Sequence, residues 1–113
     1  MDDSLLAMRV PHRRMRDPAF RRSQEDGRWS PHIAPINALV DALHDETGNW
    51  IPHVAPLYGG VDAEMLMIAR DPGPMTNPTG GGSGFLCLEN DDATAELMAW
   101  LLDEVEIAAS RVM

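Results

Sequence analysis

The sequence predicts a small α/β domain, organised as a partial three-layer α/β/α sandwich with a short parallel sheet. Three observations favour this class. A continuous apolar run at residues 65–69 is typical of a strand buried on both faces of a parallel sheet. Helical hydrophobic patterns precede and follow it at residues 33–46 and 92–106. With 113 residues, 44% of them hydrophobic, the chain has the size and composition of one globular domain.

Residues 1–30 form a basic, Arg-rich segment that we expect to be poorly ordered. It shows no hydrophobic period, and Pro11 and Pro18 interrupt it. Residues 1–28 carry seven Arg and five acidic residues, whereas residues 29–113 carry two Arg and thirteen acidic residues, a net charge of −11. The arginines available for DNA phosphates are Arg9, Arg13, Arg14, Arg16, Arg21 and Arg22. A solvated tail is an equally good interpretation of them.

The first helix is predicted over residues 33–46. Its apolar side chains recur at helical spacing: Ile33, Ile36, Leu39, Val40 and Leu43. Pro35 is compatible with a helix only in the first turn. Gly48 is a natural residue for the position just after the last turn, so the helix is expected to end there.

The clearest strand signal lies at residues 64–69, after a connection at 49–63 that is punctuated by proline and glycine. We expect this strand to be buried on both faces, because residues 65–69 are apolar without interruption. Asp71 follows its carboxyl end. Binding sites of open α/β sheets collect at that edge, so Asp71 is the first candidate for chemistry.

A glycine-rich loop is predicted at residues 72–90. Glycine has no Cβ and tolerates positive φ, so the run from Gly80 to Gly84 would let the backbone approach a ligand closely. A flexible surface loop explains the same glycines, and their number does not decide between the two. Phe85 supplies an aromatic ring that could bind a planar base.

A second helix is predicted over residues 92–106, capped at its start by Asp91 or Asp92. One apolar stripe is expected to face the core: Leu97, Met98, Leu101, Leu102 and Val105, with Trp100 beside it. Residues 107–113 end in two apolar residues, which read as the start of a second strand.

Several classes of site are excluded by composition. The single cysteine, Cys87, permits neither an internal disulfide nor an iron–sulfur cluster held by cysteines. The four histidines show no zinc-ligand spacing, and the chain has no lysine for a phosphate-binding loop. There is no apolar run of membrane-spanning length and no signal peptide, so we expect a cytoplasmic protein without a membrane partner.

A resemblance to a known family rests on three segments in order. Residues 69–74, Ala-Arg-Asp-Pro-Gly-Pro, resemble the first active-site motif of the uracil-DNA glycosylase superfamily, in which a strand ends in a small residue, a polar or acidic pair, and Pro-Gly or Pro-Tyr. Residues 52–63, with their Gly59-Gly60 pair, are similar to the lead-in of bacterial members. Residues 83–96 are similar to the loop and helix start that follow. The resemblance covers roughly residues 33–111.

The resemblance implies a role for each matched residue. Asp71 would orient the attacking water and stabilise positive charge on the sugar as the N-glycosidic bond of a uracil-type base breaks. The extruded base would stack on Phe85. The implied substrate-binding residues are Arg70, Pro72, Gly73, Pro74, Gly84, Phe85 and Asn90. The implied partner is uracil-containing DNA, single- or double-stranded, with no cofactor and no metal.

Two departures from the family pattern shape the expectation. Arg70 stands where many members carry an acidic residue or an amide, so Asp71 would act from the next position. The family's base-reading strand and its later His- or Ser-bearing loop would follow Met113. We therefore expect residues 31–113 to be the N-terminal half of a glycosylase-like domain, truncated relative to the family fold and weakly active or inactive alone. A second copy or a complementing C-terminal half would be its protein partner.

Two other functions fit parts of the sequence. A non-catalytic acidic α/β module could bind another protein through an unpaired strand edge and uncovered apolar surface. A DNA-mimicking inhibitor would use the acidic charge of residues 29–113. The acidic residues are scattered over helix faces, however, as is usual for solvated surfaces.

Overall fold

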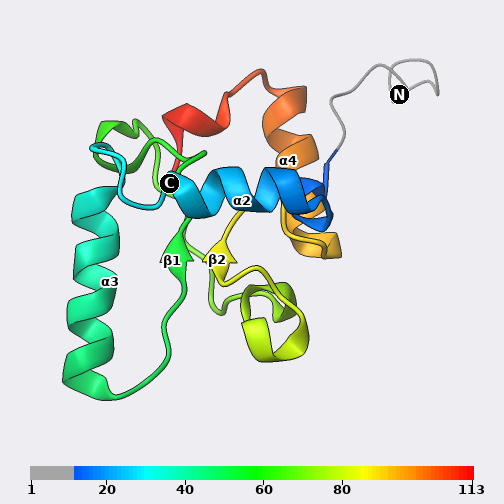
Figure 1. Cartoon of the computed structure of the whole chain (residues 1–113). Helices are drawn as coiled ribbons and strands as arrows, with labels where there is room; N and C mark the ends of the chain where they lie inside the picture. Colours follow the sequence, from blue (N-terminus) through cyan, green and yellow to red (C-terminus); the bar gives the residue numbers. More distant parts are fainter. Residues whose placement is uncertain (1–11) are drawn as a thin grey trace.

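Two short parallel strands lie near the centre of the molecule, with helices around them (Figure 1). The computed structural model describes residues 12–113. The strands are β1 (His53–Val54) and β2 (Phe85–Leu86), and the α-helices of the described residues are α2 (Pro18–Asp26), α3 (Ala34–Thr47) and α4 (Ala93–Glu104). Short 3₁₀ turns connect them: η1 (Arg14–Arg16), η2 (Gly60–Asp62), η3 (Pro74–Thr76), η4 (Pro78–Gly80) and η5 (Ala109–Arg111). The chain is therefore a small mixed α/β domain.

The parallel sheet is short and has a defined register. His53 lies opposite Phe85 and Val54 opposite Leu86, and the Ala55 N–H donates to the Leu86 carbonyl at 3.0 Å. A second parallel pairing joins Met65 to Val112 as an isolated bridge. Neither β1 nor β2 was predicted, because two residues are too few to give a period in the sequence.

The prediction of a doubly buried strand at residues 64–69 is wrong. The segment pairs on one side with residues 111–113, through Met67 N–H to Met113 carbonyl at 2.7 Å and Met113 N–H to Met65 carbonyl at 3.0 Å. Met65, Leu66 and Ile68 are exposed, Ile68 at 89%, and only the partly buried Met67 packs against the core. An apolar strand is buried on both faces only where other elements pack on both faces. This segment pairs with residues 111–113 on one side and leaves most of its side chains exposed.

The segment before residue 30 contains more regular structure than its sequence suggests. Asp17 caps α2 by accepting the Ala19 N–H, and Pro18 occupies the first turn, where its missing N–H has no cost. Met15 reaches the core and is 1% exposed. The expectation of a poorly ordered segment is thus replaced, for residues 14–26, by a helix that packs on the body. Residues 1–11, including Arg9, lie outside the described residues.

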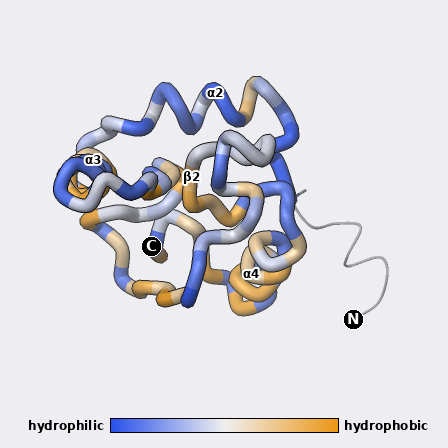
Figure 2. The backbone as a smooth tube through the Cα atoms, turned by 90° about the horizontal axis from the view of Figure 1, so that it is seen from below, coloured by the Kyte–Doolittle hydropathy of each residue, from blue (hydrophilic) through white to orange (hydrophobic). Residues whose placement is uncertain are grey.

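The two predicted helices are confirmed at their ends. Gly48 follows α3 in the left-handed conformation, with φ of 72°, and its N–H donates to the His44 carbonyl. Asp92 caps α4 by accepting the Ala95 N–H at 2.8 Å. The predicted stripe of α4 is wrong in part: Ala99 and Leu102 are buried, whereas Leu97, Leu101 and Val105 are exposed. Figure 2 shows this apolar helix at the outside of the molecule.

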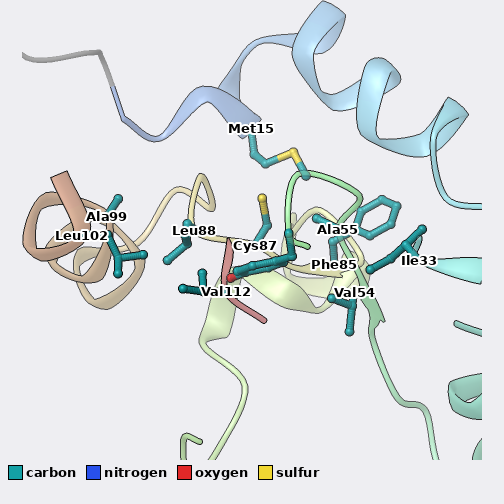
Figure 3. Packing of buried hydrophobic residues seen from close by; sticks show 11 residues of the cluster. Met15, Ile33, Val54, Ala55, Phe85, Cys87, Leu88, Ala99, Leu102 and Val112 are labelled. Atoms are coloured by element: carbon teal, nitrogen blue, oxygen red, sulfur yellow. The ribbon is translucent and has the colours of Figure 1, made fainter. Parts of the chain in front are cut away.

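The hydrophobic core joins residues from both ends of the chain (Figure 3). Its buried members are Met15, Ile33, Val54, Ala55, Tyr58, Phe85, Cys87, Leu88, Ala99, Leu102 and Val112. Burial raises the pKa of the Cys87 thiol to about 12 and raises that of the Tyr58 hydroxyl as well. Within residues 12–113, every helix is too short or too polar to cross a bilayer.

Candidate functional site

The glycine-rich loop folds back on the turn that precedes it. The Ser83 and Gly84 N–H groups donate to the carbonyls of Met75 and Thr76, both at 2.9 Å. A Cβ at Gly82 would lie 2.5 Å from the backbone of Met75, so only glycine fits there. The close backbone approach expected from these glycines is thus made within the loop itself.

Asn90 connects this loop to β2. Its side chain is 2% exposed, its Nδ2 donates to the Phe85 carbonyl at 2.8 Å, and its Oδ1 accepts the Ser83 hydroxyl at 2.6 Å. The Ser83 Oγ also accepts the Phe85 N–H. Both polar ends of the Asn90 amide therefore position Phe85 and the loop, which differs from the substrate contact that the resemblance implies.

Phe85 lies inside the core rather than on an open surface. Its residue exposure is 0%, and Ile33 and Val54 lie beside it in Figure 3. The guanidinium carbon of Arg28 lies 4.8 Å from the ring centroid, which is cation–π range. The ring is therefore present at the expected place in the loop, but every face of it is covered.

Arg70 and Asp71 form an exposed ion pair after the Met65 bridge. The Arg70 Nε lies 2.7 Å from Asp71 Oδ2, and the two side chains are 95% and 64% exposed. A pair this exposed contributes little to stability, because water screens it. Asp71 Oδ1 has no hydrogen-bond partner among residues 12–113, so one carboxylate oxygen faces solvent and can accept a water.

The turn at Pro72–Pro74 lies against the start of α4. A Cβ at Gly73 would lie 2.8 Å from Asp92 Oδ2, the cap of that helix, and the Gly73 carbonyl accepts the Thr76 hydroxyl at 2.6 Å. The structure thus brings Gly73, Gly84 and Asn90 into one group of loops. In the part of the chain that the structure describes, no polar or ring contact joins Asp71 to Phe85.

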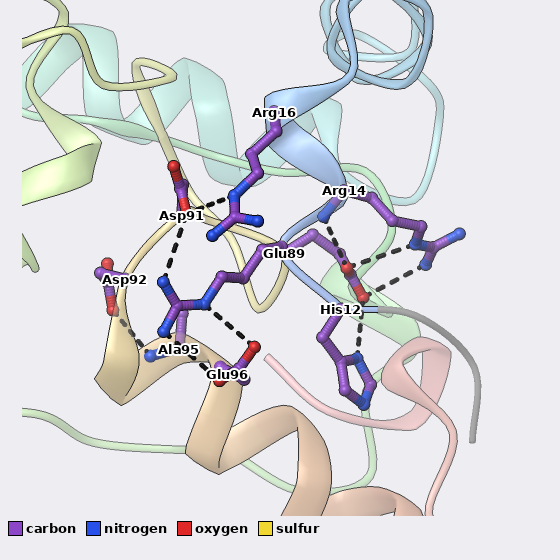
Figure 4. Close-up of polar contacts among 9 residues, drawn as sticks. His12, Arg14, Arg16, Glu89, Asp91, Asp92, Ala95 and Glu96 are labelled. Atoms are coloured by element: carbon purple, nitrogen blue, oxygen red, sulfur yellow. Dashed lines mark hydrogen bonds and ion pairs between the residues drawn. The ribbon is translucent and has the colours of Figure 1, made fainter. Parts of the chain in front are cut away.

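A cluster of charges joins the N-terminal segment to the turn after β2 (Figure 4). Glu89, although 5% exposed, accepts the Arg14 backbone N–H at 3.1 Å and lies 3.3 Å from the Arg14 guanidinium. His12 bridges it to α4, with Nδ1 3.5 Å from Glu89 Oε2 and Nε2 2.8 Å from Asp103 Oδ2, the latter in ion-pair range without hydrogen-bond geometry. Sequence reasoning missed this cluster because its partners are more than 70 residues apart.

Two further arginines, Arg13 and Arg16, are bonded to acidic residues next to this cluster. Arg13 contacts Asp91 and Glu96, and Arg16 donates to Asp91 at 2.6 Å, so the hydrogen bond from Arg16 lowers the pKa of the Asp91 carboxyl. Arg21 donates to the Met15 carbonyl. Arg16, Arg21 and Arg22 line a shallow cavity of about 290 Å³ on α2, together with Pro18 and Glu25. Within the described residues, phosphate contacts would therefore concentrate on α2.

Asn37 is a further residue that sequence reasoning overlooked. It is 0% exposed, donates to the carbonyls of Arg28 and Val54 at 3.0 and 3.1 Å, and accepts the Val54 N–H at 2.8 Å. A signal was present, since an amide at position 37 interrupts the apolar face that contains Ile33 and Val40.

Comparison with protein-family models, with curated proteins and with solved structures finds no match for this chain. The function therefore has to be inferred from the residues and the geometry described above.

Proposed function

We propose that this protein is a uracil-DNA glycosylase-like protein, which binds an extruded uracil-type base from DNA. In this proposal the short parallel sheet corresponds to the central layer of the family's three-layer sandwich. Asp71 holds the water that attacks the sugar carbon, and the base stacks on the ring of Phe85 after the side chains that cover this ring have moved.

One observation carries the proposal: the three segments of the resemblance converge in space. The motif turn contacts the start of α4 through Gly73 and Asp92. The glycine-rich loop closes on η3 through the Gly84 N–H, and Asn90 ties that loop to β2. The pairing of β1 with β2 brings residues 52–63 to residues 83–96 as well, so each of the three segments contacts another one although they are far apart in the sequence.

The chemistry assigned to Asp71 requires a carboxyl group in contact with water. Its 64% exposed side chain meets this need. As the glycosidic bond breaks, positive charge develops on the sugar, and a nearby anion stabilises that transition state. The acidic body would repel phosphates, so the arginines of α2 are the described cations best placed to contact the DNA backbone.

The test uses a single-stranded oligonucleotide that contains one deoxyuridine. Abasic sites formed by the protein are cleaved with alkali and resolved on a gel, while fluorescence anisotropy compares binding with a thymidine control strand. We expect tighter binding to the uracil strand and slow uracil release. Asp71→Asn should reduce release by about 10²-fold or more, as loss of a transition-state electrostatic partner does. Asp62→Asn, an exposed acidic residue in η2, is the matched control and should leave release unchanged.

The outcomes separate the two halves of the proposal. Tighter binding to the uracil strand without release of uracil supports base binding and contradicts the hydrolytic role. Release that survives Asp71→Asn removes the assignment of that residue. Equal affinity for the uracil and thymidine strands, with no release, overturns the proposal.

A second candidate, a non-catalytic protein-binding module, is favoured by the exposed segment at residues 65–68. Leu66 and Ile68 are both largely exposed, and within residues 12–113 the Leu66 backbone has no hydrogen-bond partner, so the segment offers a strand edge. Size-exclusion chromatography with light scattering tests it. Self-association that Ile68→Lys abolishes supports this function, whereas a monomer at high concentration argues against self-association through this edge.

A further inference from the structure

Arg28 covers the one aromatic ring assigned to base stacking. Its guanidinium carbon lies 4.8 Å from the Phe85 ring centroid, and the ring is completely buried while Arg28 itself is half-buried. The guanidinium is a planar cation within cation–π range of the ring. Arg28 is thus a partly exposed residue in contact with the buried ring of Phe85.

The side chain of Arg28 is held weakly, although its backbone is held firmly. Its carbonyl accepts the Nδ2 of the buried Asn37, which also bonds both polar backbone groups of Val54 in β1. β1 pairs with β2, and Asn90 fixes the Phe85 carbonyl. The Arg28 Nε, in contrast, is buried without a hydrogen-bond partner among the described residues.

This difference makes the side chain suited to moving. A buried N–H without a partner is unfavourable, so rotation of the guanidinium into water restores a hydrogen bond at Nε. The rotation loses a cation–π contact, but an aromatic–base stack on the same ring face replaces it with an interaction of similar strength. The backbone anchors stay in place throughout.

We propose that Arg28 closes the stacking face of Phe85, and that a base binds only when the Arg28 side chain swings out. The assignment of the base as ligand rests on the proposed function above. The covering role of Arg28 does not, so the two can be tested separately.

The first experiment measures the cover directly. The chain has two phenylalanines, so labelling with 4-fluorophenylalanine gives two ¹⁹F resonances, and Phe20→Leu assigns them. The difference in ¹⁹F shift between H₂O and D₂O reports solvent contact at Phe85. Arg28→Ala should produce a clear solvent isotope shift, whereas the wild type and Arg28→Leu, which keeps a bulky cover without charge, should show almost none. Equal shifts in all three, with matching circular dichroism spectra, overturn the inference.

The second experiment measures the consequence for binding, using the uracil and thymidine strands described above. The ratio of the two affinities removes the general effect of losing a positive charge, and Arg22→Ala controls for it. We expect Arg28→Ala to raise the ratio by about fivefold or more, the change expected when a competing stack is removed, and Arg28→Leu to leave it unchanged. A lower ratio for Arg28→Ala would mean that Arg28 itself contacts the base, and an unchanged ratio with an opened ring would mean that stacking on Phe85 is not limiting. Either result overturns the proposal that Arg28 must swing out before a base binds to Phe85. An opened ring without any uracil preference in any variant overturns the proposed function instead.

Discussion

Two apolar runs of this chain, residues 65–69 and 85–88, have similar sequences and opposite environments. In the run at 85–88, Phe85, Cys87 and Leu88 lie in the core and only Leu86 is exposed, whereas Ile68 in the other run is 89% exposed. The difference lies in their polar anchors. Ser83 and Asn90 bond the backbone of Phe85 from both sides, while the run at 65–69 has backbone bonds to residues 111–113 alone. Hydrophobicity makes burial favourable for both runs, but only the run at 85–88 has side-chain hydrogen bonds, from the Ser83 hydroxyl and the Asn90 amide, that hold its backbone in the core.

The largest effect should come from truncating the buried ring. Phe85→Ala removes the largest fully buried side chain and should reduce the free energy of unfolding by about 3–5 kcal/mol, enough to unfold a marginal domain. Ile68→Ala, the same kind of truncation in the exposed run, should change it by less than about 0.5 kcal/mol. Urea titration followed by circular dichroism measures both. Similar losses for the two variants would show that the runs are equally buried in solution.

The anchor of the buried run is the next test. Asn90→Leu keeps the side-chain volume but removes the two short hydrogen bonds of Asn90, and the Phe85 carbonyl and the Ser83 hydroxyl keep the 3.3 Å contact with each other. We expect a loss of about 1–3 kcal/mol in the free energy of unfolding, the usual result of removing hydrogen bonds to a buried group. Asn49→Leu, at an exposed position where only the backbone is hydrogen-bonded within the described residues, is the control. A neutral Asn90→Leu would mean that packing alone holds β2.

Thiol chemistry compares the two runs without denaturant. Cys87 is buried and burial raises its pKa to about 12, so it should resist a thiol reagent at pH 8 until the protein unfolds. A thiol placed at the exposed position by Ile68→Cys, with Cys87→Ser, should react at the rate of a free peptide.

The same buried thiol makes stability depend on pH. Because the pKa of Cys87 in the folded state lies above the ordinary value of 9.0, the unfolded state loses this proton first as pH rises. Stability should therefore fall between about pH 9 and pH 12 in the wild type, and less in Cys87→Ser.

The smallest effect is expected at the edge of the exposed run. The hydrogen bond from Arg111 lowers the pKa of the Glu64 carboxyl below its ordinary value of 4.5. A lowered pKa stabilises the folded state above that value and ceases to do so as pH falls through the lowered pKa. Glu64→Gln should therefore be slightly less stable than the wild type at pH 7, and the difference should vanish in acid. Thermal melts at pH 7 and pH 3 make this comparison, and a difference that grows in acid would contradict it.

The parts of the fold that the sequence predicts well are those set by local rules. The ends of α3 and α4 follow from Gly48 and Asp92, residues whose effect acts within one turn. The strands could not be predicted in this way, because β1 and β2 have two residues each and pair across 32 positions of sequence. The start of α2 also follows a local rule, the Asp17 cap followed by Pro18, but the packing of the segment before it includes ion pairs such as Arg16 with Asp91, for which a single sequence has no signal.

The candidate site likewise has one part that the sequence predicts and one part that it does not. The positions of Asp71, Pro72 and Gly73 after an extended segment follow from the order of residues, and the structure places them in an exposed turn at α4. What the order of residues cannot provide is the direction in which a side chain points. Phe85 faces the core, and Arg28 covers it from a segment that precedes it by 57 positions.

The three consecutive glycines at residues 80–82 are equivalent in composition but differ in what they would tolerate. A Cβ at Gly80 would meet only the Pro74 carbonyl oxygen, at 3.9 Å, and its backbone is ordinary, so saturation mutagenesis should find this position permissive. Gly81 has φ of 83° with open space, so asparagine should be the best replacement. At Gly82 any side chain collides with the Met75 backbone, so no replacement should be accepted. Folded variants of this chain should therefore keep glycine at position 82 and vary at positions 80 and 81.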